Sequence, residues 1–234
     1  MKQSVALSLV LVLLSNSLAL FIYAASIDRR FVYVPWALIV LTAALWWARG
    51  HNRLSWADIG LSEGSWRRSA VFGIVTGLGL AVPLVIFLAF PFLLSQPVHY
   101  REIQNLDVVG LLWRLGVELS IATALTEEIL FRGILQALFK RSLNTTQAII
   151  STNVVFALWH LVINALSVNQ NVLVLPLIPT VAAQVIGYLG SLIVVGIGGL
   201  VFSVLRERTN HLAGSIGLHW VTVAAMTLLI YLRR

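Results

Sequence analysis

Long apolar runs separated by short polar segments make up almost the whole chain. An α-helix needs about 20 apolar residues to cross the hydrocarbon core of a bilayer. Seven runs are long enough to be expected as spanning helices, namely Gln3–Ala25, Phe31–Ala48, Ala70–Leu94, Asp107–Leu138, Gln147–Leu166, Thr180–Leu205 and Leu212–Leu232. The fourth is longer than one crossing needs, so we expect it to tilt, bend or extend beyond the membrane.

Three further segments qualify this pattern. The N-terminal run resembles a signal peptide, but its apolar stretch exceeds the usual length of about 7–15 residues, so we expect it to be retained as the first helix. Val172–Thr180 is apolar but holds two prolines, and would form a short re-entrant or interfacial eighth element. Arg49–Ser69 combines Trp56 and Trp66 with four arginines, which predicts an interfacial amphipathic element at the headgroup level. An ordinary cytoplasmic loop is the alternative for that segment.

The composition agrees with an all-α, polytopic transmembrane bundle of about seven or eight helices in a single domain, residues 1–234. Hydrophobic residues make up 59% of the chain and charged residues 11%, against about 45–50% and about 25% in soluble domains. The chain has no cysteine, which excludes disulfides, thiolate metal sites and cysteine nucleophiles. We attribute the net charge of +7 to basic cytoplasmic loops and not to nucleic-acid binding.

The distribution of Lys and Arg predicts the orientation. With seven spans, the side that holds the N-terminus carries nine of these residues and the opposite side five. Since basic residues accumulate in cytoplasmic loops, the N-terminus is predicted to be cytoplasmic. A short chain without an organellar targeting segment points to a prokaryotic plasma membrane.

Ionisable residues within the apolar runs are few. A charge at the bilayer centre costs at least about 2.5–3.5 kcal/mol, so such residues face the protein interior or a wet cavity and usually have a function. The set consists of Arg114, Glu118, Glu127, Glu128 and Arg132 on the fourth run, His160 on the fifth and His219 on the last.

Helical geometry divides the charges of the fourth run. At about 100° per residue, the i,i+4 spacing pairs Arg114 with Glu118 and Glu128 with Arg132. Glu127 points elsewhere and has no charge partner on its own helix, which makes it the candidate for general acid/base chemistry. The alternative is that all five residues are structural and form buried ion pairs.

A polar stripe is predicted on the fifth run. Asn153, Phe156, His160 and Asn164 recur at spacings of three and four, so they share a helix face. A lone histidine is more often a satisfied core residue than a catalyst. A histidine that faces an unpaired Glu127 is a stronger candidate for catalysis.

On the last run, His219 has Ser215 and Thr222 on nearly the same face. Gly214 and Gly217 allow another helix to approach closely. These positions predict a second histidine directed into the bundle.

Three fragments, in this order, resemble a known family. EEILFR fits EExxxR, FALWH fits FxxxH, and RTNHLAGSIGLHW is similar to the closing stretch that carries a second histidine. The family is that of the CAAX protease and bacteriocin-processing (CPBP, Abi) intramembrane glutamic endopeptidases. The resemblance covers most of the chain, with a catalytic core over residues 107–227, and implies an all-α membrane fold with a membrane-embedded catalytic cavity.

The resemblance also implies roles for these residues. Glu127 with His160 would activate a water molecule for peptide-bond hydrolysis, while Glu128, Arg132 and Phe156 would support the site. His219 would stand near the oxyanion, where a donor contributes several kcal/mol.

The chain departs from the family pattern at one position. The family often places Asn four residues after the second histidine, where this chain has Val223. The residues that could replace its oxyanion or substrate contact are Thr222, Ser215, Asn153 and Asn164.

Other functions use the same residues. By type, Glu127, His160 and His219 are plausible zinc ligands, since catalytic zinc usually has three protein ligands and water. We favour the metal-free mechanism, without a cofactor. A catalytically weak or inactive immunity or scaffold protein is another class, and a proton-coupled transporter is disfavoured because no internal repeat is visible. The expected partners are the lipid bilayer and a membrane-associated peptide or protein, whereas the cleavage site, recognition of a prenyl group and the oligomeric state stay open.

Overall fold

A computed structural model describes residues 1–25, 27, 32–62, 64–89, 101–170 and 180–233. All secondary structure in these residues is helical, without strands, which confirms the all-α prediction. The long helices are α1 (Lys2–Ala24), α2 (Tyr33–Gly50), α4 (Trp66–Ala89), α9 (Thr145–Trp159), α10 (Leu161–Gln170), α11 (Thr180–Thr209) and α12 (Leu212–Leu232). Two short helices are α3 (Trp56–Ile59) and α5 (Arg101–Gln104).

One further helix, Val108–Lys140, passes through the middle of the molecule. It changes between α and π geometry along its length. Its segments are α6 (Val108–Trp113), η2 (Arg114–Leu125), α7 (Thr126–Glu128), η3 (Ile129–Leu135) and α8 (Gln136–Lys140), where η denotes π-helix. The predicted fourth span is therefore confirmed as one helix, with a different internal geometry.

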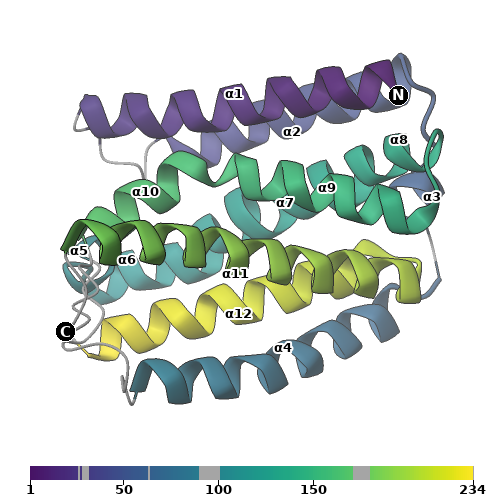
Figure 1. Ribbon diagram of the computed structural model, residues 1–234. Helices are drawn as coiled ribbons and strands as arrows, with labels where there is room; N and C mark the ends of the chain where they lie inside the picture. Colours follow the sequence, from purple (N-terminus) through teal and green to yellow (C-terminus); the bar gives the residue numbers. More distant parts are fainter. Residues whose placement is uncertain (26, 28–31, 63, 90–100, 171–179, 234) are drawn as a thin grey trace.

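The helices form a bundle in which α1 and α2 occupy one edge and α4 the opposite edge (Figure 1). At the α4 edge, α12 packs along α4. In turn, α11 packs on α9 and α12, and α1 packs on α9 and α10. The largest apolar core, with Phe131, Phe156 and Trp159, lies between α1, α2, η3 and α9.

Four helices of the described residues are long and apolar enough to cross a membrane: Lys2–Ala24, Val108–Lys140, Thr180–Thr209 and Leu212–Leu232. A bent pair, Thr145–Trp159 with Leu161–Val168, makes a fifth when it is counted as one span. The expected count of seven or eight is therefore not confirmed, although α2 and α4 form where apolar runs predict helices. The proposed eighth element lies in residues 171–179, outside the described residues.

Glycines let α4 and α12 approach closely, as Gly214 and Gly217 predict. A Cβ added at Gly73 would lie 2.0 Å from the carbonyl oxygen of Gly214. One added at Gly217 would lie 3.2 Å from Ile74 Cγ1. Contact between small residues is a common way for membrane helices to associate.

The Arg49–Ser69 segment contains a single helical turn, α3, before α4 begins. Ser55 and Asp58 form a capping box at the start of α3. Gly60 then adopts a left-handed conformation (φ 84°), and its carbonyl accepts a hydrogen bond from Leu212 N at 2.8 Å. The segment thus packs on the start of α12 and forms no long amphipathic helix. Its place at the membrane surface stays a prediction.

Candidate active site

The helix that carries both glutamates is widened by its π turns. Ser120 Oγ in η2 donates to Leu115 O at 3.2 Å, and Thr126 Oγ1 at the start of α7 donates to Ile121 O in η2 at 2.7 Å, each five residues back. The assumption of uniform α geometry is therefore wrong for this helix. Short π segments are frequent at functional sites.

The two predicted i,i+4 ion pairs nevertheless form. Arg114 Nη1 donates to Glu118 Oε1. Arg132 Nη1 donates to Glu128 Oε1 at 3.1 Å, and both of these side chains are fully buried. Glu127, between the two pairs in sequence, is not part of either of them.

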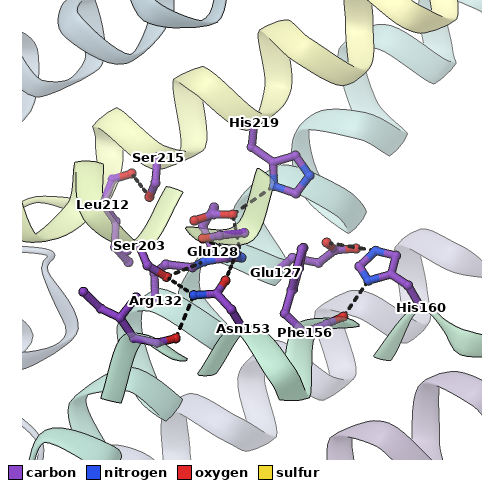
Figure 2. Close-up of polar contacts among 12 residues, drawn as sticks. Glu127, Glu128, Arg132, Asn153, Phe156, His160, Ser203, Leu212, Ser215 and His219 are labelled. Carbon is purple, nitrogen blue, oxygen red and sulfur yellow. Dashed lines mark hydrogen bonds and ion pairs between the residues drawn. The ribbon is translucent and has the colours of Figure 1, made fainter. Parts of the chain in front are cut away.

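Arg132 is the centre of a buried hydrogen-bond network (Figure 2). Besides Glu128, its Nη2 donates to Asn153 Oδ1 at 3.2 Å and to Gly199 O at 3.0 Å. Its Nε donates to Ser203 Oγ at 3.4 Å, and Ser203 Oγ also accepts from Asn153 Nδ2 at 3.0 Å. A buried charge is tolerated when its hydrogen-bonding capacity is met in this way. The network joins η3 to α9 and α11.

His219 belongs to this same network. Its Nδ1 lies 2.9 Å from Glu128 Oε1, and an ionised carboxylate only accepts, so Nδ1 carries the hydrogen. The ring stacks on Phe202 with centroids 4.7 Å apart. Nε2 is the ring nitrogen left for another partner.

Phe156 lies between the two histidines. Its ring centroid is 4.6 Å from that of His160 and 6.4 Å from that of His219, in edge-to-face arrangements. The guanidinium of Arg132 lies 4.1 Å from the Phe156 ring centroid, within cation–π range. Phe156 therefore packs directly against three of the candidate residues, as a supporting side chain would.

Glu127 and His160 face each other across the site (Figure 2). His160 Nε2 lies 3.8 Å from Glu127 Oε2, which exceeds hydrogen-bond distance. Glu127 Oε2 is buried and accepts no hydrogen bond from the described residues. The predicted absence of a charge partner on its own helix is thus matched by a histidine from another helix.

The backbone breaks at His160, which sets the direction of its ring. His160 N donates to Ala157 O at 3.1 Å, so the Phe156 carbonyl is free to accept from His160 Nδ1 at 2.8 Å. The two helices meet at 49°. The prediction of one continuous helix over Gln147–Leu166 is therefore wrong, and Asn164 lies on α10, off the helix that carries Asn153.

The candidates for oxyanion contact differ in their free hydrogen-bonding capacity. Ser215 Oγ donates to Leu212 O and Thr222 Oγ1 to Leu218 O, both on their own helix. Asn153 bonds Arg132, Ser203 and Ile149, which favours a supporting role. Asn164 Nδ2 is buried without a hydrogen-bond partner among the described residues, so of these four side chains it has the donor that is free.

The geometry does not assemble the three suggested zinc ligands into one set. Glu127 faces His160, whereas His219 is directed to Glu128. In the part of the chain that the structure describes, no group of three or more His, Asp or Glu side chains is placed to hold a metal ion.

No residue of α11 was predicted to belong to the site, yet Gly199, Phe202 and Ser203 contact it. Gly199 is needed because an added Cβ would lie 2.3 Å from Asn153 Oδ1 and 2.8 Å from Arg132 Nη2. The available sequence signal is GIGGLVFS, in which small residues line an otherwise apolar helix and indicate a closely packed face.

Comparison with known protein families identifies the family of the chain. The model of the Rce1-like family, described as type II CAAX prenyl endopeptidase Rce1-like, matches residues 109–225, half of the 234-residue chain. The chain belongs to this family. The match confirms the resemblance to the CAAX proteases, and with the apolar helices it makes the chain an integral membrane protein with their type of fold. No curated protein and no solved structure matched the chain.

The matched residues of this Rce1-like chain include all five charged or titratable side chains of the site, namely Glu127, Glu128, Arg132, His160 and His219. They run from α6 into α12. The helices α1 to α5 precede them, so the family match says nothing about those five.

Proposed function

We propose that this Rce1-like chain is an intramembrane endopeptidase that hydrolyses a peptide bond of a membrane-associated substrate through a water molecule held by Glu127 and His160. The observation that supports this most is the buried Glu127 carboxylate, 3.8 Å from His160 Nε2 and without a hydrogen-bond donor among the described residues. A buried polar group left in this way is unusual in a native protein and calls for an explanation. A catalytic base in a membrane-embedded cavity explains it.

The tautomer of His160 supports a water between the two side chains. A carbonyl oxygen only accepts, so the contact of His160 Nδ1 with Phe156 O places the ring hydrogen on Nδ1. Nε2 of the neutral ring and the Glu127 carboxylate are then both acceptors. Two facing acceptors need a donor between them, and one water supplies an O–H to each.

In this arrangement the water oxygen presents its lone pairs to a substrate carbonyl. The oxygen adds to the carbonyl carbon while Glu127 takes one water proton, and a tetrahedral oxyanion forms. The C–N bond then breaks, and the proton on Glu127 passes to the leaving nitrogen. The products are a carboxyl terminus and a free amine, so all atoms of the water are accounted for.

His219 is the proposed oxyanion donor. Its Nδ1–H is directed to Glu128, so Nε2 is the ring nitrogen available to an oxyanion, to which it can donate as the imidazolium. Asn164 Nδ2 is the further candidate donor where the family often has Asn and this chain has Val223.

The test is cleavage of membrane-anchored peptides by the purified protein in detergent, with prenylated and unprenylated CAAX tails and unrelated membrane-protein tails as substrates. Glu127→Gln should reduce cleavage at least about a thousandfold, since this range is typical when a group central to the chemical step is removed. Glu207→Gln is the matched control, because Glu207 pairs with Lys140 and Gln136 away from the site. Equal rates for Glu127→Gln and the wild type would exclude the mechanism.

The same assay separates the other functions. Activity that a chelator removes and zinc restores would favour a zinc-dependent peptidase over the glutamate mechanism. No cleavage of any tail by the folded wild type would favour the immunity or scaffold function.

A further inference from the structure

The first helix reaches the break at His160 through two polar side chains. Ser15 Oγ donates to Trp159 O at 3.1 Å. Asn16 Nδ2 donates to Leu158 O at 3.0 Å, and Asn16 Oδ1 accepts from Val162 N at 2.8 Å. These bonds join residues more than 140 positions apart in the sequence.

The two backbone groups bound by Asn16 would be partners of each other in an unbroken helix. An α-helix pairs the N–H of each residue with the carbonyl four positions earlier. Val162 N and Leu158 O have this spacing. The Asn16 amide stands in their place, with its acceptor on the N–H and its donor on the carbonyl. A side chain inserted into the hydrogen-bond ladder is a recognised cause of a helix kink.

The kink determines how His160 meets Glu127. Because the helix breaks there, His160 N donates to Ala157 O, and Phe156 O accepts the ring Nδ1–H at 2.8 Å. That bond leaves Nε2 free on the side of Glu127. Closing the ladder would return Phe156 O to the N–H of residue 160 and remove the acceptor that orients the ring.

We propose that Asn16 is a positioning residue for His160, so that α1 forms part of the active site although it lies outside the matched residues 109–225. This inference rests on the proposed function for its effect on catalysis. Its effect on the helix break does not depend on that function.

The test compares three variants in detergent. Asn16→Ala removes both bonds to the helix break, together with the bond from Asn16 Nδ2 to Val12 O on its own helix, and Asn16→Asp keeps an acceptor for Val162 N but loses the donor. Ser17→Ala is the matched control, because Ser17 is exposed on the same helix. Misplacing a catalytic group by about 1 Å can cost about a hundredfold in rate, so kcat of Asn16→Ala should fall about ten- to a hundredfold with KM little changed. Asn16→Asp should recover part of this loss, and Ser17→Ala should match the wild type.

Amide hydrogen exchange gives a readout that needs no activity. Peptides that contain Val162 should exchange faster in Asn16→Ala than in Ser17→Ala, while peptides from α12 exchange equally. Equal exchange at Val162 would overturn the inference, as would unchanged kcat in Asn16→Ala beside an active wild type. Inactivity of the wild type together with faster exchange would reject the proposed function and keep the role of Asn16 in the break. If Asn16→Ala does not fold, the comparison is made with Asn16→Asp, which must then show a lower kcat than Ser17→Ala.

Discussion

The two adjacent glutamates of the central helix have opposite surroundings. Glu128 is fully buried and accepts hydrogen bonds from Arg132 and His219 through Oε1, while its Oε2 has no donor among the described residues. Glu127 is also buried, but it accepts no hydrogen bond from a described residue, and its Oε2 faces His160 Nε2 across 3.8 Å. Two adjacent positions of the helix therefore hold one carboxylate that stabilises the bundle through hydrogen bonds and one that no described residue holds by a hydrogen bond.

The energetic consequence of this difference can be estimated. A hydrogen-bonded ion pair such as that of Glu128 and Arg132 rigidifies a low-dielectric interior. A buried acceptor without a donor costs about 1–3 kcal/mol. Glu128 offsets this cost through the bonds of its Oε1, whereas Glu127 has no bond to a described residue that would offset it. Substitutions at the two glutamates should therefore affect different measurements.

The largest expected effect on stability is that of Glu128→Gln. This change leaves the buried charge of Arg132 without its counter-charge, and breaking a buried pair costs about 3–5 kcal/mol. Glu127→Gln should change the free energy of unfolding by less than about 1 kcal/mol, because it breaks no hydrogen bond from a described residue. Thermal unfolding in detergent measures both. Similar midpoints for the two variants would contradict the division of roles.

Gly199→Ala should have the next largest effect on stability, because Gly199 packs against the hydrogen-bond network of Arg132. The new Cβ would lie 2.3 Å from Asn153 Oδ1 and 2.8 Å from Arg132 Nη2. Overpacking of this kind costs about 1–3 kcal/mol. Gly190→Ala on the same helix is the control, since nothing lies within 4 Å of its Cβ. A lower unfolding midpoint is expected for Gly199→Ala only, and equal midpoints would argue against tight packing at the network.

Ser203→Ala should have a smaller effect. It removes the acceptor of Arg132 Nε and Asn153 Nδ2, and one hydrogen bond contributes about 1 kcal/mol net. Ser191→Ala removes only a bond to Tyr188 O on its own helix, so its effect on the unfolding midpoint should be less. The reverse order would show that the network does not extend to α11.

The smallest expected effect on stability is that of a substitution at His211, which lies outside the candidate active site. His211 Nδ1 accepts from Ala213 N at 2.9 Å and caps α12. Burial, with a smaller contribution from Arg206, lowers the pKa of His211, and a hydrogen bond of the ring with the Ser62 backbone opposes this shift. The folded state therefore disfavours the protonated ring, so its contribution to stability is complete above the ordinary pKa and is lost as the pH falls below it.

His211→Asn keeps a capping side chain but cannot titrate. The unfolding midpoint of this variant should fall less between neutral and mildly acid pH than that of the wild type. An unchanged slope would show that His211 is not the group responsible.

Apolar runs predicted the helices well, because about 20 apolar residues in sequence are a local feature. The predicted Leu212–Leu232 coincides with α12, and both i,i+4 ion pairs form. That Glu127 lacks a charge partner on its own helix followed from the i,i+4 spacing, whereas its pairing with His160 was implied by the resemblance to the CAAX proteases. These inferences need only spacing and residue type.

The features that were missed depend on contacts between distant segments. No proline or glycine near His160 predicts the helix break. The hydrogen bonds of Asn16, which lies far away in the sequence on α1, satisfy the backbone groups that the break leaves unpaired. The π turns of η2 also could not be predicted, because an apolar helix of either kind has the same composition. Gly199 and Ser203 gained a role only once α11 packed beside Arg132.

The π-helical stretch has a consequence for insertions and deletions. Each π turn closes five residues back where an α turn closes four back, so η2 holds more residues than an α-helix with the same number of turns. Removing one residue between Arg114 and Leu125 would turn everything downstream by about 100° relative to the upstream helix. Glu128 would then take the register of Glu127 and face His160. The number of residues before the glutamates, as well as their identity, decides which of them faces His160.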